Sequence, residues 1–281
     1  PIIQHMPKTS DRLKQIKDNI ASACERARRE VSEVKLIVVT KTVSTEDIKE
    51  VIKNGFVDFG ENRVLHFKQV ADEIKHFLNE QDGADGLPET VNWHMIGHLQ
   101  RNKVKQILKV ASLIHSVDTL RLAEEIDTVA GKMGVKSDVL LQLNCSGEPQ
   151  KYGAPVGAAI HLADQIATLP NVRLRGLMTM APLTKDKDVV RACFVRAREL
   201  FEDIRAESVI GRDFVHLSMG MSQDYEIAVE EGATMLRIGS AELPLIFQTV
   251  SGLSCARQMS KYSMCVAGKA DSLQGPIIPN R

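Results

Sequence analysis

The residues best suited to chemistry stand directly after short apolar runs. Lys41 follows the run 36–40, where its amine could form a Schiff base with an aldehyde. Serines and glycines follow two later runs, in 218–222 and 239–240, where small residues let backbone N–H groups approach an anion and hydroxyls add donors. An amine facing an anion-binding loop suits a phosphorylated aldehyde, and pyridoxal phosphate is the common cofactor of that type.

Both features also have simpler interpretations. A lysine at a strand end often only reaches for water, and a Ser-Gly-Ser loop can be a tight turn. His94 and His98 are four residues apart but lack carboxylate or thiolate partners at ligand spacing, so we expect core or rim histidines and no metal site. Glu61 and Glu148 lack an obvious partner.

The elements that must position these residues repeat along the chain. Eight apolar runs alternate with helix-period segments, which indicates right-handed βαβ units and a parallel sheet. Eight such units predict an α/β fold of the (β/α)8 TIM barrel type. An open doubly wound sheet is the alternative, but no GxGxxG follows the first run. The predicted strands are 35–40, 56–59, 92–96, 112–117, 138–143, 174–178, 213–217 and 234–238.

Three segments lie outside or between these units. An extra N-terminal helix is predicted at about 10–30, started by Thr9 or Ser10 and followed by apolar residues at steps of three and four. Glycines, acids and a proline predict a surface connection at 79–89. We expect one domain over 1–281, with its barrel core at about 35–250 and a polar tail at about 251–281.

Composition excludes several classes of protein. The chain has 281 residues, with 36 basic and 36 acidic side chains, so no net field attracts nucleic acid or an anionic membrane. Hydrophobic residues make up 43%, yet no apolar run approaches the roughly 20 residues of a membrane helix. Five scattered cysteines and the lack of a signal-peptide pattern predict a reducing compartment, the cytoplasm or an organelle matrix.

Taken together and in order, the motifs resemble the pyridoxal-phosphate homeostasis protein family, single-barrel relatives of the alanine racemase N-terminal domain. Any one motif is weak evidence, but their order from about residue 35 to 241 is specific. The matching stretches are VTKT (39–42), FGEN (59–62), WHMIGHLQ (93–100), HSVD (115–118), NCSGE (144–148), RGLMT (175–179), LSMGMS (217–222) and RIGS (237–240).

The resemblance implies roles for particular residues. Lys41 would hold pyridoxal 5'-phosphate as the internal aldimine, and Arg237 would face the pyridine nitrogen. Because a guanidinium keeps its protons, it disfavours a pyridinium and makes the ring a poorer electron sink. The other positions that the resemblance brings to the cofactor are Ser218, Ser222, Gly239 and Ser240 at the phosphate, and Asn62 and His94 near the ring.

Some positions depart from the family pattern. Arg63 stands where a tyrosine is usual, and Tyr152 where a serine is common after Lys151. Ser240 replaces a threonine and keeps the hydroxyl. Glu-Leu-Pro at 242–244 replaces an aliphatic-Phe-Gly sequence, which concerns the last helix more than the phosphate site.

The resemblance implies a cofactor-binding protein in intracellular vitamin B6 homeostasis, with apo forms of pyridoxal-phosphate-dependent enzymes as candidate recipients. The alternative is an amino-acid racemase, which needs a second base on the opposite face of the substrate. In alanine racemase that base is a tyrosine, and Tyr152, Tyr225 and Tyr262 match no such motif. Only 41 residues follow Ser240, so we expect no second domain, a non-enzymatic role and a monomer. A Schiff-base aldolase ranks lower, because its lysine usually lies on a later strand.

Overall fold

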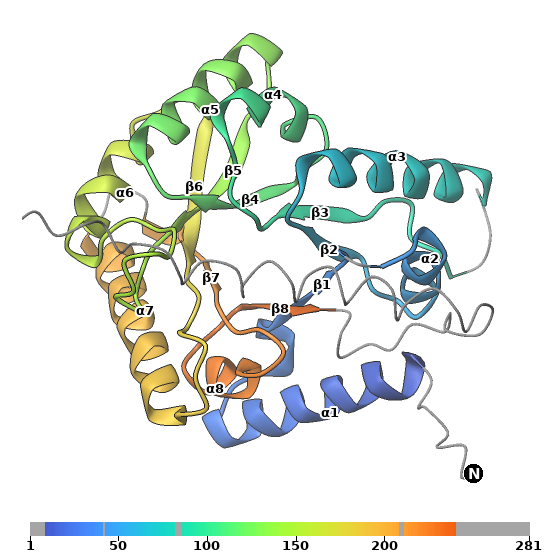
Figure 1. The fold of residues 1–281 in the computed structure, drawn as a ribbon, viewed down its shortest axis with the longest axis horizontal. Helices are drawn as coiled ribbons and strands as arrows, with labels where there is room; N and C mark the ends of the chain where they lie inside the picture. The colour runs from blue at the N-terminus through green and yellow to red at the C-terminus, as the bar shows by residue number, and fades with distance from the viewer. Residues whose placement is uncertain (1–8, 42, 82–85, 208–210, 240–281) are drawn as a thin grey trace, which may run out of the picture. The chain divides into compact units, whose positions relative to one another are not determined.

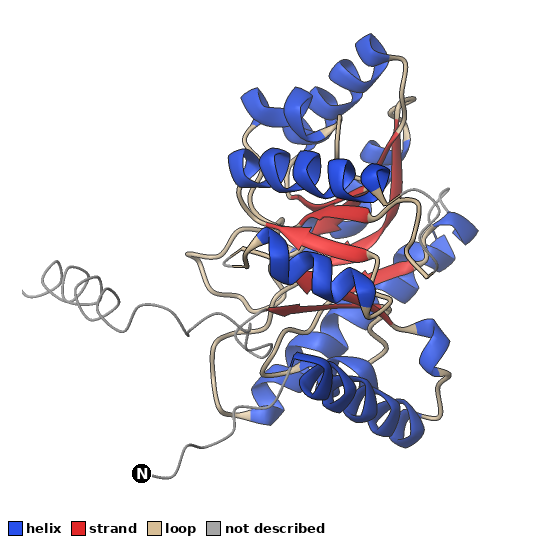
Figure 2. Cartoon of the chain, turned by 90° about the vertical axis from the view of Figure 1, so that its right-hand side faces the viewer, coloured by secondary structure: helices blue, strands red, loops and turns tan. Residues whose placement is uncertain are grey.

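The computed structural model describes residues 9–41, 43–81, 86–207 and 211–239. Eight parallel strands form a closed barrel surrounded by helices, as Figures 1 and 2 show. The strands are β1 (Lys35–Val39), β2 (Asp58–Glu61), β3 (Asn92–Met95), β4 (Leu113–Val117), β5 (Ser137–Gln142), β6 (Val172–Met178), β7 (His216–Ser218) and β8 (Met235–Gly239). The helices are α1 (Thr9–Ala27), α2 (Thr45–Lys53), α3 (Val64–Glu80), α4 (Val104–Ile107), α5 (Leu120–Met133), α6 (Ala159–Ala167), α7 (Lys187–Glu207) and α8 (Tyr225–Glu230).

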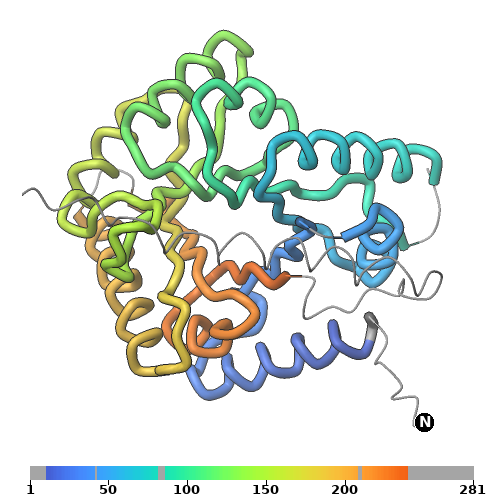
Figure 3. Tube along the Cα trace, viewed as in Figure 1, coloured from blue at the N-terminus to red at the C-terminus, as the bar shows by residue number. Residues whose placement is uncertain are grey.

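Strand order follows chain order around the whole barrel, and β8 closes it by pairing with β1. The trace in Figure 3 accordingly runs once around, so that the first and last strands meet. In this closing pair Ile37 lies beside Arg237, and Val39 beside Gly239. The predicted eight-stranded barrel with an extra N-terminal helix is therefore confirmed.

Two strand predictions were displaced along the chain. The second was expected at 56–59, but Phe56 belongs to the turn that ends α2, where its N–H bonds the Val51 carbonyl 3.4 Å away. The buried Phe56 ring is thus an apolar residue that packs without belonging to a strand. The seventh was expected at 213–217, but Gly211–Asp213 forms a 3-10 turn and β7 begins at His216.

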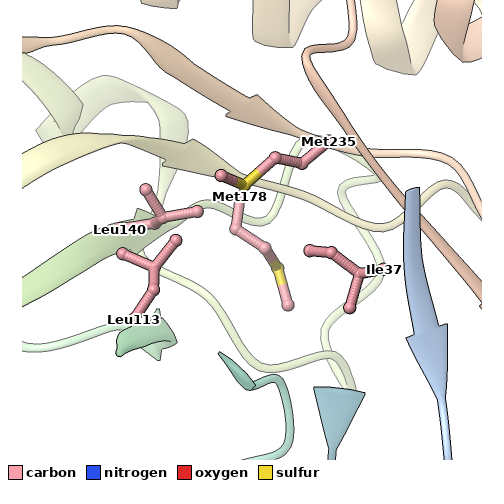
Figure 4. Close-up of a cluster of buried hydrophobic side chains, with 5 residues drawn as sticks. All are labelled: Ile37, Leu113, Leu140, Met178 and Met235. Atoms are coloured by element: carbon pink, nitrogen blue, oxygen red, sulfur yellow. The ribbon is translucent and has the colours of Figure 1, made fainter. Parts of the chain in front are cut away.

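One part of the barrel interior is apolar. Side chains from five different strands point toward one another there, as Figure 4 shows. They are Ile37, Leu113, Leu140, Met178 and Met235, each at most 5% exposed. Strands that are not neighbours can touch only through the interior, so this cluster stabilises the closed form of the barrel. The rest of the interior is more polar, and that part builds the site described below.

Helix α1 packs against the last helix of the barrel. Its buried residues Leu13, Ile16 and Ile20 recur at steps of three and four, which is the apolar face that the sequence predicts. On its polar side Arg26 pairs with Glu230 at 2.7 Å. The extra helix is therefore an integral part of the outer helical layer.

Several predictions concern residues without a described structure or with only a partial one. Helix α3 continues to Glu80 and so takes up the first two residues of the predicted connection 79–89, of which 82–85 lie outside the described residues. The tail at 251–281 lies outside the described residues. Within the described part of the chain, none of the helices is both long and apolar enough to cross a membrane. The same residues contain no group of three or more histidines, cysteines, aspartates or glutamates arranged to hold a metal ion.

Candidate functional site

The carboxyl ends of the strands form the mouth of the barrel, where the loops carry the predicted site residues. Lys41 lies two residues beyond β1 and is exposed, although it directly follows the buried run at the end of that strand. Asn62 follows β2 and is also exposed. Its backbone is held against Gly97 after β3, where a Cβ would stand 2.3 Å from the Asn62 carbonyl oxygen.

The loop after β7 meets the end of β8 at the mouth. The Gly239 N–H donates to Ser222 Oγ at 3.3 Å. Gly220 allows this approach: its φ of +87° suits glycine, and a Cβ there would lie 2.5 Å from the Ala228 methyl. Because Gly239 pairs with Val39, this contact and Lys41 lie on the same side of the mouth.

Arg237 lies beneath the mouth on the interior face of β8, with only 3% of its surface exposed. Its guanidinium donates to Ser218 Oγ at 2.5 Å and to the Thr179 carbonyl at 2.9 Å. Burial lowers the pKa of Arg237 to about 10, partly offset by Asp224. The guanidinium therefore stays charged at neutral pH.

Asp224 is the carboxylate that faces Arg237 from the loop after β7. It accepts the Met221 N–H at 2.5 Å. Burial raises the pKa of Asp224, while the Met221 hydrogen bond and the charge of Arg237 act in the opposite direction. Asp224 therefore interacts both with the backbone of its own loop, at Met221, and with the charge of Arg237.

Two buried histidines continue the polar interior away from Arg237. His115 Nδ1 lies 2.9 Å from Ser218 Oγ, and His115 Nε2 lies 3.0 Å from His94 Nδ1. His94 Nε2 lies 3.0 Å from Asp58 Oδ1. Burial lowers the pKa of His115 well below its usual range, and the charge of Arg237 acts in the same direction.

Asp58 ends this polar series at the opposite end of the barrel. Its carboxylate accepts from Lys35 at 3.2 Å and from Asn92 at 3.1 Å, next to the starts of β1 and β3. Burial alone would raise the pKa of Asp58, but the hydrogen bond from His94 and the charge of Lys35 lower it overall. Asp58 is therefore a carboxylate at neutral pH.

A separate buried carboxylate lies behind the mouth. Glu61 is fully buried and accepts the Thr40 hydroxyl at 2.6 Å, and His66 Nδ1 lies 3.1 Å from the same oxygen. Its other oxygen, Oε2, has no partner among the described residues. Thr40 immediately precedes Lys41, so Glu61 anchors the end of β1.

The predicted site residues thus separate into groups. Arg237, Ser222 and Gly239 gather on one side of the barrel, with Lys41 at the end of the neighbouring strand. Asn62 lies further around the mouth. The two remaining described residues, His94 and Ser218, are buried and engaged in hydrogen bonds within the protein, and Ser240 lies outside the described residues.

Sequence reasoning assigned no role to Asp58, His115 or Asp224. A signal existed for the first two, since both are polar residues inside strands that otherwise read as apolar. Neither motif spacing nor periodicity showed that both would contact His94. Thr179 also contributes through its carbonyl, which side-chain chemistry cannot reveal.

The chain is similar to several known proteins. The family described as "Alanine racemase, N-terminal domain" matches residues 12–242. A "Pyridoxal phosphate homeostasis protein" of Aquifex aeolicus (strain VF5) is 39% identical over 230 residues, which cover 82% of this chain and 95% of that protein.

Two solved structures are also similar. The crystal structure of an unknown protein from Bifidobacterium adolescentis has a TM-score of 0.77 and 36% identity, covering 83% of this chain and 94% of that one. PipY of Synechococcus elongatus PCC7942, in a structure with PLP bound, has a TM-score of 0.65 and 33% identity. That match covers 81% of this chain and 99% of PipY.

Proposed function

The chain belongs to the pyridoxal phosphate homeostasis protein family, and on that basis we propose that it binds pyridoxal 5'-phosphate and takes part in vitamin B6 homeostasis. The observation that carries the proposal is the contact between Ser222 and Gly239 on the strand that pairs with β1, next to Lys41. This contact puts hydroxyl and backbone donors on the same side of the mouth as an exposed amine.

The donor set fits this cofactor. When bound, pyridoxal phosphate supplies an aldehyde that reacts with amines, an anionic phosphate and a pyridine nitrogen. The chain offers an amine at Lys41, donors at Ser222 and Gly239, and a guanidinium at Arg237. There is also room at Gly239: among the described residues, only Ser222 Oγ, at 3.9 Å, comes within 4 Å of where a Cβ would stand.

Each of these residues has a distinct task in the proposal. The Lys41 amine attaches the cofactor at its aldehyde carbon. The Ser222 hydroxyl holds the phosphate together with Ser240, and Gly239 lies beside them, with its N–H orienting Ser222 Oγ. Arg237 faces the ring nitrogen and keeps its own proton, which limits electron withdrawal by the ring. Asn62 lies at the rim beside the ring, whereas His94 and Ser218 act through Arg237 from below.

Chemical trapping at Lys41 tests the proposal. Borohydride reduction of the purified protein with added pyridoxal phosphate, followed by peptide mass spectrometry, should find the pyridoxyl group on Lys41. Lys41→Ala should lose both the adduct and the visible absorption band. Lys105→Ala, which removes an exposed lysine of α4, should keep both. An unchanged band in Lys41→Ala would overturn the assignment.

Further parts of the proposal concern organisation and partners. We propose a monomer that passes the cofactor to apo forms of pyridoxal-phosphate-dependent enzymes, which sedimentation analysis and transfer assays test. A single domain over 1–281, with its barrel core at about 35–250, stays a prediction that limited proteolysis tests. The cytoplasmic location expected from the scattered cysteines also stays a prediction, which cell fractionation tests.

A further inference from the structure

A continuous series of hydrogen-bonding groups crosses the barrel interior. It runs from Arg237 through Ser218, His115 and His94 to Asp58, with separations of 2.5, 2.9, 3.0 and 3.0 Å. Ser218 and His115 come from β7 and β4, which are not neighbours in the sheet (Figure 1), so their contact passes through the interior. All three middle groups are at most 3% exposed.

The two ends of the series cannot change their hydrogen-bonding roles. Arg237 is a guanidinium and only donates, and Asp58 is a carboxylate and only accepts. Each of the three groups between them can donate once along the series and accept once. If every contact is a hydrogen bond, His94 Nε2 donates to Asp58, His115 Nε2 donates to His94, and the Ser218 hydroxyl donates to His115.

The competing arrangement has a charged His94. Its Nδ1–H would then donate to His115, and His115 would donate to Ser218. Ser218 Oγ would accept from both sides, and its own proton would have no acceptor among the described residues. This arrangement leaves a buried hydroxyl unsatisfied and adds a buried cation between Lys35 and Arg237, so both desolvation and hydrogen bonding oppose it.

We propose that this series has one donor direction, from Arg237 to Asp58, and that His94 and His115 are neutral positioning residues for the Arg237 guanidinium. The proposal rests on the function proposed above, because Arg237 is the group placed against the pyridine nitrogen. It also changes the role expected of Ser218. Since its one proton goes to His115, Ser218 holds Arg237 in place and does not donate to the phosphate.

Histidine NMR tests the donor direction without any measurement of cofactor affinity. Long-range ¹⁵N–¹H spectra of the full chain, with and without added pyridoxal phosphate, should show His94 and His115 as neutral rings protonated at Nε2. His115 should not titrate between pH 6 and 8, because burial lowers its pKa well below the usual range. A charged His94, or an Nδ1–H form of either ring, would overturn the proposal.

Affinity measurements test the positioning role. His115→Leu should raise the Kd for pyridoxal phosphate about tenfold, the equivalent of about one hydrogen bond. His115→Gln keeps a donor and an acceptor and should stay within about threefold of the parent. His216→Gln, on the same strand as Ser218 but outside the series, is the matched control.

The outcomes separate the two proposals. If the parent protein binds the cofactor and His115→Leu binds it equally well with an unchanged absorption band, the positioning role is wrong. If the parent does not bind it, the proposed function is wrong, and the NMR result still decides the donor direction.

Discussion

Ser222 joins the loop after β7 to the end of β8. Its Oγ accepts the Gly239 N–H at 3.3 Å, which leaves the hydroxyl proton available for an anion. The proposed phosphate site therefore depends on a side chain that is already oriented by the neighbouring strand. This makes its contribution measurable by a single substitution.

Ser222→Ala should weaken pyridoxal phosphate binding about tenfold, because it removes one donor to a charged group. Ser146→Ala is the control, since Ser146 lies in the loop after β5 and bonds Asn144 at 2.9 Å. Fluorescence or absorption titration measures both. Equal Kd values for Ser222→Ala and the parent would exclude the hydroxyl from the phosphate site.

Two histidines predict a specific pH dependence of stability. Burial lowers the pKa of His115 well below 6.5 and that of His216 to about 4, with Arg175, Lys35 and His94 adding to the effect at His216 and Asp138 opposing it. Between about pH 4 and 6.5 the unfolded chain therefore binds more protons than the folded one. As the pH is lowered through this window, the free energy of unfolding falls by at most about 1.4 kcal/mol per pH unit for each group. Above the window the full stability is retained.

His216→Gln should reduce this slope, because it removes one of the two titrating groups. Urea unfolding at several pH values between 4 and 7 measures the difference from the parent. If the variant had the same slope as the parent, the pKa of His216 would be the same in the folded and the unfolded chain.

At the scale of elements, α1 is held by two kinds of contact that differ in strength. Ile20 is 4% exposed and lies in its buried face, whereas the Arg26 side chain is 49% exposed and pairs with Glu226 and Glu230. Burial of a large apolar side chain contributes more to the free energy of unfolding than an exposed ion pair does. The apolar face should therefore account for most of the binding of α1 to the barrel.

Ile20→Ala should lower the free energy of unfolding by about 2–5 kcal/mol, because it leaves a cavity beneath α1. Arg26→Ala should lower the free energy of unfolding by only about 1 kcal/mol or less. Chemical denaturation of the two variants compares these effects directly. An arginine variant as destabilised as the isoleucine variant would show that the ion pairs hold the helix.

The turn after β7 gives a second prediction about an element. Gly220→Ala places a methyl 2.5 Å from the Ala228 side chain at a φ of +87°, so the turn must shift. We expect lower thermal stability and weaker cofactor binding, because Met221 and Ser222 follow directly. Gly157→Ala is the control, since a Cβ there has no atom within 4 Å among the described residues. A Gly220→Ala variant with parental Tm and Kd would refute the steric argument.

For the molecule as a whole, the question is whether a barrel with the proposed cofactor site is also an enzyme. Racemisation needs proton donors on both faces of the substrate carbon. Tyr225 is 8% exposed and its hydroxyl accepts from Asn19 of α1, in the outer helical layer. Tyr152 is 58% exposed in the loop after β5 and stacks on His98, with ring centroids 4.2 Å apart.

Amino-acid racemisation by the cofactor-loaded protein should therefore be negligible. Chiral chromatography of several amino acids, with free pyridoxal phosphate as the blank, measures it. Turnover on the order of 1 s⁻¹, the range of ordinary enzymes, would contradict the non-enzymatic role. Loss of such turnover in Tyr152→Phe would identify the second base.

The sequence by itself determined the barrel, its extra helix and the positions of Lys41, Ser222 and Gly239 at or just after the ends of strands. Buried parallel strands need continuous apolar runs, and their helices need apolar residues at steps of three and four, so both patterns are local and readable. Displaced boundaries, such as that of β2, arose where an apolar residue, Phe56, packed outside a strand.

Only the tertiary structure decided which polar side chains contact one another beneath the mouth. His115 and Ser218 are 103 residues apart and meet because barrel closure brings β4 and β7 to face each other across the interior. Hydrogen-bond direction there depends on both ends of the series, Arg237 and Asp58. No local pattern encodes that dependence, because each middle group alone can donate or accept, and only the closed barrel joins them between a fixed donor and a fixed acceptor.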